Sequence, residues 1–279
     1  MQKRTFGPTG ADIPIIGQGT WQIDGGSRAA TIAALQRGID LGMIHIDTAE
    51  MYGDAELIIA DAITGRRDDV YLVSKVLPSN ASRKGTIAAC EKSLKRLKTG
   101  HLDCYLLHWP GSYPLEDTIA AFEQLVKDGK IASWGLSNFD VDELDEALSI
   151  AGENRIACNQ VLYHLQERAI EHAVIPWCKK HNVVVVAYSP FGHGGFPSPG
   201  SASGRVLAEI ASAHNATPYQ IALAFLVREA PLFTIPKAQK ESHVADNAAA
   251  GDIVLTPDEI ARIDRAFPKG AASRGLPMI

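Results

Sequence analysis

The sequence predicts an α/β fold, a single-domain (β/α)8 TIM barrel spanning residues 1–279, on the basis of three observations. Eight short runs rich in β-branched residues alternate with longer segments of helical period. Several of these runs are apolar nearly throughout, which is typical of parallel strands covered on both faces. The chain has 279 residues, a length at which α/β barrels form one unit. A doubly wound open sheet is the alternative.

The predicted strands follow one another along most of the chain. They cover residues 15–21, 43–47, 70–75, 103–109, 132–138, 157–163, 183–190 and 233–237. Before the first strand, residues 4–14 contain the turn signals Gly7-Pro8 and Gly10, which predict a β-hairpin that closes the bottom of the barrel. After the seventh strand, residues 192–204 are rich in glycine, proline and serine and predict a loop at the barrel mouth rather than a domain boundary.

Apolar period and capping residues mark the helices between the strands. Residues 82–98 repeat apolar side chains at helical spacing and predict a helix that ends near Gly100. Capping-box patterns begin at Asp140, Thr217 and Thr256, the last two with proline at the first helical position. Right-handed crossovers would place each helix on the outside of the barrel.

Composition narrows the classes of partner. Hydrophobic residues make up 46% of the chain and charged residues 21%, which are values of a globular protein. The net charge of −5 and the lack of a basic run argue against nucleic acid or an acidic membrane surface. The four cysteines have neither CxxC nor metal-ligand spacing, so we expect reduced thiols and no metal site. Apolar runs are too short to span a bilayer, and we expect a cytoplasmic monomer or weak oligomer that binds a small molecule.

Four polar residues are placed to meet at the carboxyl rim of the predicted barrel. Asp47, Lys75 and His108 end the second, third and fourth strands, and Tyr52 lies in the loop after Asp47. Each alone has a structural interpretation, as a helix cap, a packed ring or a solvated lysine. Together they suit carbonyl reduction, which needs a hydride donor and a proton for the developing alkoxide.

The chemistry assigns a role to each of the four. We expect Tyr52 to be the general acid, because a cation within about 4–6 Å lowers a tyrosine pKa of about 10 by about 1–3 units. Lys75 would supply that cation and Asp47 would hold it in place. His108 would orient the carbonyl by a hydrogen bond. His45, two residues before Asp47, is expected to be a hydrogen-bonded core histidine.

The chain resembles the aldo-keto reductase superfamily in these four residues and in a series of strand motifs. The motifs are Gly17-Gln-Gly-Thr-Trp21, Leu107-His-Trp109, Gly135-Leu-Ser-Asn-Phe139, Asn159-Gln-Val-Leu-Tyr-His164, Tyr188-Ser-Pro190 and Ile235-Pro-Lys237. They cover the chain from about residue 17 to residue 247. The segments around Tyr52 and His108 are most similar to bacterial members that reduce methylglyoxal and similar small carbonyls.

The resemblance implies a nicotinamide cofactor, NADPH with NADH left open. No GxGxxG follows a strand, so the cofactor would lie extended across the rim. Ser137, Asn138 and Gln160 would contact its carboxamide, Tyr188 would stack beneath its ring, and Lys237 would meet the 2′-phosphate. The full set of expected cofactor contacts is Gly19, Thr20, Trp21, Asp47, Ser137, Asn138, Gln160, Tyr188, Ser189, Pro190, Phe191, Ile235, Pro236, Lys237, Ala238, His243 and Asn247.

Two of these positions depart from the family pattern. Ala238 stands where a serine is common, and His243 stands where an arginine commonly grips the 2′-phosphate. Because histidine is only partly cationic near neutral pH, we expect weaker discrimination between the two cofactors.

An apolar wall is expected around the four polar residues. Trp21, Met51, Trp109 and Phe191 would form it, with Tyr113 and the tail near Leu276 as possible additions, and such a wall suits small aldehydes and ketones. Two alternatives remain at this point. One is a Schiff-base aldolase that uses Lys75 or Lys237 as the nucleophile, and the other is a cofactor-binding regulatory subunit without significant turnover.

Overall fold

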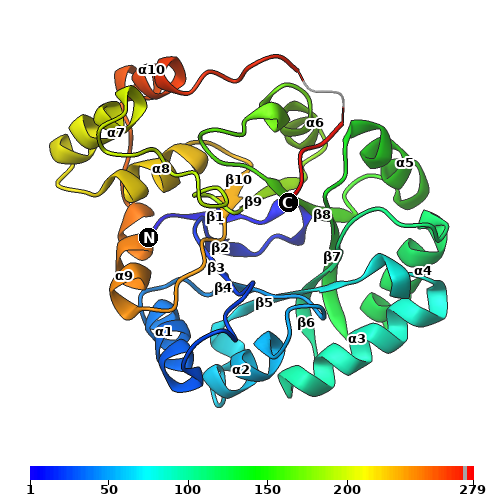
Figure 1. Cartoon of the computed structure of the whole chain (residues 1–279). Coiled ribbons are helices and arrows are strands. Elements are labelled where there is room, and N and C mark those ends of the chain that lie inside the picture. Colours follow the sequence, from blue (N-terminus) through cyan, green and yellow to red (C-terminus); the bar gives the residue numbers. More distant parts are fainter. Residues whose placement is uncertain (273–274) are drawn as a thin grey trace.

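A computed structural model describes residues 1–272 and 275–279 and shows the predicted barrel. Eight parallel strands form one sheet in chain order, from β3 to β10 (Figure 1). The strands are β3 (Gln18–Gly19), β4 (His45–Asp47), β5 (Tyr71–Val76), β6 (Leu102–Leu107), β7 (Ile131–Ser137), β8 (Ile156–Leu162), β9 (Val184–Tyr188) and β10 (Leu232–Thr234). Each overlaps one of the predicted strands.

The first and last strands meet and close the sheet. Ile16 bridges Thr234 in parallel, and Thr234 N donates to Ile15 O at 3.0 Å. Gly17 N donates in turn to Thr234 O at 2.8 Å. The open doubly wound sheet is therefore excluded.

Helices surround the barrel, as Figure 1 shows. They are α1 (Arg28–Asp40), α2 (Ala55–Ala62), α3 (Arg83–Leu97), α4 (Leu115–Lys127), α5 (Val141–Ala151), α6 (Val174–Lys180), α7 (Ala202–Ala213), α8 (Pro218–Leu226), α9 (Glu241–Ala250) and α10 (Pro257–Ala266). Short 3-10 turns are η1 (Gly7–Thr9), η2 (Arg67–Asp69), η3 (Pro78–Asn80) and η4 (Ala169–Glu171). No helix in the described part of the chain is long and apolar enough to cross a membrane.

The predicted helix caps are present. Capping boxes begin α5, α8 and α10 at Asp140, Thr217 and Thr256. Helix α3 ends slightly earlier than predicted, because Lys98 rather than Gly100 takes the left-handed conformation after its last turn, with φ of 52°.

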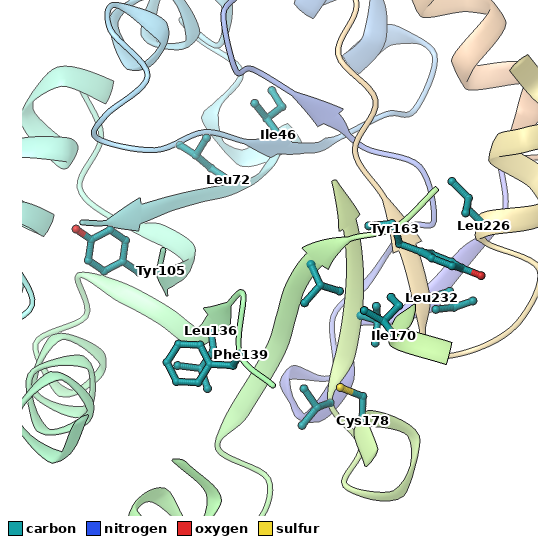
Figure 2. Close-up of a cluster of buried hydrophobic side chains, with 14 of the residues drawn as sticks. Ile46, Leu72, Tyr105, Leu136, Phe139, Tyr163, Ile170, Cys178, Leu226 and Leu232 are labelled. Atoms are coloured by element: carbon teal, nitrogen blue, oxygen red, sulfur yellow. The ribbon is translucent and has the colours of Figure 1, made fainter. Parts of the chain in front are cut away.

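Strand alternation sorts side chains between two cores. Ile46, Leu72, Tyr105 and Leu136 point outward into the layer between strands and helices (Figure 2). Their neighbours along the strands point into the barrel, where they form a second buried cluster that includes Val73, Cys104, Leu106, Cys158 and Val186. The same alternation turns Asp47 and Lys75 inward at the carboxyl ends of their strands.

The N-terminal hairpin lies against the barrel bottom as predicted. Strands β1 (Lys3–Thr5) and β2 (Asp12–Pro14) pair antiparallel, and Phe6 between them is fully buried. The Phe6 ring centre lies 5.2 Å from that of Tyr71, 5.3 Å from that of Phe233 and 5.8 Å from that of His45. The bottom of the barrel is therefore packed, and the opposite end is left for a ligand.

His45 lies in this packed interior, one layer below Asp47. It is buried as expected, but its Nδ1 atom has no hydrogen-bond partner among the described residues, so the expectation of a hydrogen-bonded ring is wrong at this atom. Burial lowers the pKa of His45 to about 4, and the charge of Lys75 acts in the same direction, while Asp47 and Asp103 oppose it.

This histidine should make stability depend on pH in one window. Below pH about 6.5 the unfolded chain gains a proton on His45 that the folded chain does not take up until pH about 4. The free energy of unfolding should therefore fall with decreasing pH in this window, and His45→Leu should reduce that slope by up to about 1.4 kcal/mol per pH unit. Urea unfolding at a series of pH values measures both slopes.

Val254→Ala, at a side chain that is 70% exposed, serves as the control and should leave the slope unchanged. Identical slopes in the wild type and His45→Leu would show that His45 is not held neutral by the fold.

Candidate active site

The structure brings Asp47, Tyr52, Lys75 and His108 together at the carboxyl rim. Lys75 Nζ donates to Asp47 Oδ1 at 2.5 Å and to Thr48 O at 2.7 Å. The same ammonium lies 5.0 Å from the centre of the Tyr52 ring. Tyr52 Oη is 3.4 Å from His108 Nε2. A phenol, an ammonium, a carboxylate and an imidazole thus meet from β4, β5, the residue directly after β6 and the loop after β4.

The loop after β4 carries Tyr52 back over Lys75. Glu50 fixes this loop, because its main-chain N donates to Lys75 O at 3.2 Å and its carboxylate accepts from Leu77 N at 2.6 Å. Asn80 Nδ2 donates to the same carboxylate oxygen at 3.0 Å. The position of the Tyr52 ring therefore depends on contacts with the loop that follows β5.

The Lys75–Asp47 pair is almost entirely removed from solvent. A buried ion pair is tolerated only where further hydrogen bonds satisfy both partners. Here Thr48 O accepts from the ammonium, and Gln160 Nε2 donates to Asp47 Oδ2 at 2.7 Å. Burial alone would lower the pKa of Lys75, but the charge of Asp47 and its hydrogen bond raise that pKa above its usual value. Lys75 is therefore a fixed cation.

The pKa of Tyr52 differs from the sequence-based expectation. Burial of the phenol raises this pKa, and Lys75, although it lowers it, does not offset the effect of burial. The expected net lowering is wrong, because loss of hydration penalises the phenolate more than one nearby cation stabilises it. Tyr52 consequently keeps its proton at neutral pH, as a proton donor must.

His108 is neutral for the same electrostatic reason. Burial and, to a smaller extent, the nearby charge of Lys75 together lower its pKa to about 2. Its Nδ1 atom is buried with no hydrogen-bond partner in the described part of the chain. A buried N–H without a partner costs more than an unused acceptor, so we assign the single ring proton to Nε2, which faces Tyr52.

Polar side chains at the ends of β7, β8 and β9 form a floor beside the four residues. Asn138 Nδ2 donates to His108 O at 3.0 Å and to Ser137 Oγ at 3.1 Å. Tyr188 Oη donates to Asn138 Oδ1 at 2.8 Å. The side chains of Asn138 and Gln160, both expected to touch a cofactor, are thus also held by hydrogen bonds within the protein.

A cavity of about 540 Å³, here called the rim cavity, opens above this floor. Its lining residues are Gly19, Thr20, Trp21, Gln22, Asp47, Met51, Tyr52, His108, Trp109, Ser137, Asn138, Gln160, Tyr188, Ser189, Pro190, Phe191, Gly192, His193, Gly194, Ile235, Lys237, Met278 and Ile279. Most of the expected contacts are on this list, including all four residues of the expected apolar wall. Lys75 lies buried beneath it.

Some expected residues lie outside the lining of the rim cavity. Among the described residues, Pro236, Ala238, His243 and Asn247 do not line it. Tyr113 and Leu276, the suggested additions to the wall, do not line it either, and Met278 and Ile279 of the tail lie there instead.

Sequence reasoning missed His193, which lines the rim cavity in ring contact with Trp21. The two ring centres are 5.8 Å apart. Gly192 and Gly194, on either side of His193, have φ of 71° and 82°, a left-handed conformation that glycine adopts without strain. The signal in the sequence that could have identified this residue is the pair of glycines beside His193, because glycine allows the backbone to approach a ligand closely.

The residues present fit a nicotinamide cofactor. The floor offers amide and hydroxyl groups that can donate and accept hydrogen bonds, and Tyr188 offers a ring face. Exposed Lys237 supplies a cation elsewhere in the lining. His243 lies on α9, exposed, close in sequence to Lys237. Within residues 1–272 and 275–279, no group of three His, Cys, Asp or Glu side chains could hold a metal ion.

Comparison with protein families and characterised proteins agrees with this geometry. The model of the aldo/keto reductase family matches residues 15–267. Methylglyoxal reductase YeaE of Escherichia coli is 44% identical over 284 residues and covers all of both chains. Glyoxal reductase of Bacillus subtilis is 34% identical over 91% of this chain and 89% of its own.

Solved structures show the same similarity. An aldo/keto reductase from Klebsiella pneumoniae in complex with NADP and acetate is 43% identical, with a TM-score of 0.93 over the full length of both chains. An aldo-keto reductase from the same organism in complex with NADPH is also 43% identical, with a TM-score of 0.92.

The ionisation state of His108 can be read directly. In ¹⁵N-labelled protein, both ring nitrogens of His108 should keep the chemical shifts of a neutral imidazole protonated at Nε2 from pH 8 to pH 5, because its pKa is lowered to about 2. His108→Gln assigns the signals by difference. A transition to the imidazolium form above pH 5 would contradict the electrostatic description of the site.

Proposed function

The chain belongs to the aldo/keto reductase family, and on this premise we propose that it reduces small aldehydes and ketones to alcohols with NADPH, with Tyr52 as the general acid. The observation that carries the proposal is the meeting of Tyr52 Oη and His108 Nε2 beside the buried Lys75–Asp47 pair. Methylglyoxal and similar small carbonyls are the proposed substrates, supported by the named activities of the similar reductases.

Each of the four residues has one task in the reaction. The bound cofactor supplies the hydride. Tyr52 donates its proton from Oη to the oxygen on which negative charge develops, and the ammonium of Lys75 stabilises the phenolate that remains. His108 donates a hydrogen bond from Nε2 to the substrate carbonyl, and its neutral state avoids placing a second cation next to Lys75. Asp47 keeps Lys75 charged and in position.

Residues of the floor and rim hold the cofactor. Ser137, Asn138 and Gln160 would hold the carboxamide, and Tyr188 would offer its ring face to the nicotinamide. Lys237 attracts the 2′-phosphate and favours NADPH. His243 is exposed on α9 and carries no permanent charge, so NADH is also used to a measurable extent.

Apolar side chains bound the space in front of Tyr52. Trp21, Met51, Trp109 and Phe191 line the rim cavity, and such a wall excludes water from the reacting carbonyl while it binds small apolar groups. An aldolase that attacks with Lys75 is disfavoured, because that lysine is held as a cation and a nucleophilic amine must be neutral. A regulatory subunit without turnover would not need all four of the polar residues Asp47, Tyr52, Lys75 and His108.

We place the protein in the cytoplasm as a monomer or weak oligomer. The cytoplasmic location is supported by four buried free thiols, Cys90, Cys104, Cys158 and Cys178, which suit a reducing compartment.

Replacement of Tyr52 tests the assigned acid. Tyr52→Phe keeps the ring and removes the proton, so kcat for methylglyoxal should fall by about 10²–10⁴-fold while the Kd for NADPH stays within about threefold. Loss of NADPH absorbance measures turnover, and quenching of protein fluorescence measures binding.

Running the wild type with both cofactors should give a higher kcat/KM for NADPH than for NADH.

Tyr219→Phe is the matched control, because that phenol is half-exposed on α8 and does not line the rim cavity. It should behave as the wild type. Turnover by Tyr52→Phe at a tenth of the wild-type rate or more would show that another group supplies the proton.

A further inference from the structure

Two side-chain amides on the floor of the rim cavity have orientations fixed by groups that can only accept hydrogen bonds. Gln160 Nε2 donates to Asp47 Oδ2 at 2.7 Å, and the Asp47 carboxylate is the partner of the Lys75 ammonium. Asn138 Nδ2 donates to the main-chain carbonyl of His108 at 3.0 Å. Turning either amide over would set two acceptor oxygens against each other in a buried site.

This fixed orientation determines which atoms remain for a ligand. Among the described residues, no side chain or main-chain group donates a hydrogen bond to Gln160 Oε1, so that oxygen is a free acceptor in the lining of the cavity. Ser137 Oγ accepts from Asn138 Nδ2 at 3.1 Å and therefore keeps its hydroxyl proton to donate. Ser137 and Gln160 are register partners on β7 and β8, so the acceptor and the donor lie side by side.

A neighbouring acceptor and donor of this kind complement a primary carboxamide. The amide NH2 group meets Gln160 Oε1, and the amide oxygen accepts from the Ser137 hydroxyl. A methyl ketone in the same place still accepts from Ser137, but it has no proton for Gln160 Oε1 and would cover that oxygen without giving it a partner.

We propose that Asp47, besides pairing with Lys75, fixes the orientation of the Gln160 amide. Through this orientation Asp47 determines that the site offers an acceptor to the NH2 group of the cofactor carboxamide. One carboxylate then serves both purposes, since Oδ1 holds the ammonium and Oδ2 holds the amide. This inference rests on the proposed function, and it makes Asp47 a positioning residue for the cofactor. Proton supply and cofactor recognition thus share one buried group.

Binding of two ligands that differ only at the amide tests the proposal. The probes are NADP+ and its 3-acetylpyridine analogue, in which a methyl group replaces the NH2, and protein fluorescence quenching gives each Kd without any turnover. Wild-type protein should bind the analogue about tenfold more weakly than NADP+. In Asp47→Asn, the amide oxygen of residue 47 stays with the Lys75 ammonium and its NH2 group faces Gln160, so Gln160 turns over to accept from it, and the preference for NADP+ should fall to about twofold or less.

A double-mutant cycle shows whether the effect passes through Gln160. Gln160→Leu should also lose the preference, and Asp47→Asn added to Gln160→Leu should change it no further. Ser137→Ala is the matched control, because it removes the donor to an oxygen that both ligands share. It should weaken binding of both to a similar extent and keep the tenfold preference.

Two results would overturn the inference. The first is an Asp47→Asn protein, folded by circular dichroism, that keeps the wild-type preference for NADP+. The second is a further loss of preference when Asp47→Asn is added to Gln160→Leu. Failure of folded wild-type protein to bind NADP+ at all is a different result, and it would overturn the proposed function itself.

Discussion

Lys75 and Asp47 form an ion pair with almost no access to solvent, and the rest of the site is arranged around it. A buried charge without its partner costs several kcal/mol, so each oxygen and proton of the pair needs a defined neighbour. Thr48 and Gln160 supply those neighbours from the loop after β4 and from β8. The positive charge in turn helps to keep His108 neutral and opposes the effect of burial on Tyr52.

The barrel makes this arrangement possible because it separates packing from chemistry along each strand. At the bottom, Phe6 packs against Tyr71 and Phe233 and fills the interior. At the top, the last inward-facing positions of β4 and β5 hold Asp47 and Lys75, and the loops beyond them can vary without cost to the core. A rigid lower half thus supports a polar upper half whose groups need accurate placement.

Much of this could be predicted from the sequence, because strand periodicity and capping boxes are local signals. The eight strands, the hairpin and the meeting of Asp47, Tyr52, Lys75 and His108 follow from periodicity, family resemblance and the rule that parallel strands end at one rim. The direction of the Tyr52 pKa shift could not be predicted from the sequence, since it depends on how deeply neighbouring loops bury the phenol. The bond between Gln160 and Asp47 joins residues 113 positions apart, and nothing local indicates which end of the amide faces the carboxylate.

The ionisation of Tyr52 itself shows whether the buried pair governs the site, and tyrosinate absorbance follows it as the difference between each protein and its Tyr52→Phe counterpart. Asp47→Asn/Lys75→Met removes both charges together and leaves no unpaired ion in the core. If the buried pair governs the site, Tyr52 ionises above its ordinary pKa of about 10 in the wild type, and at still higher pH in the double variant. Equal pKa values in the two proteins would contradict the account, because the phenol would then be insensitive to the ion pair beneath it.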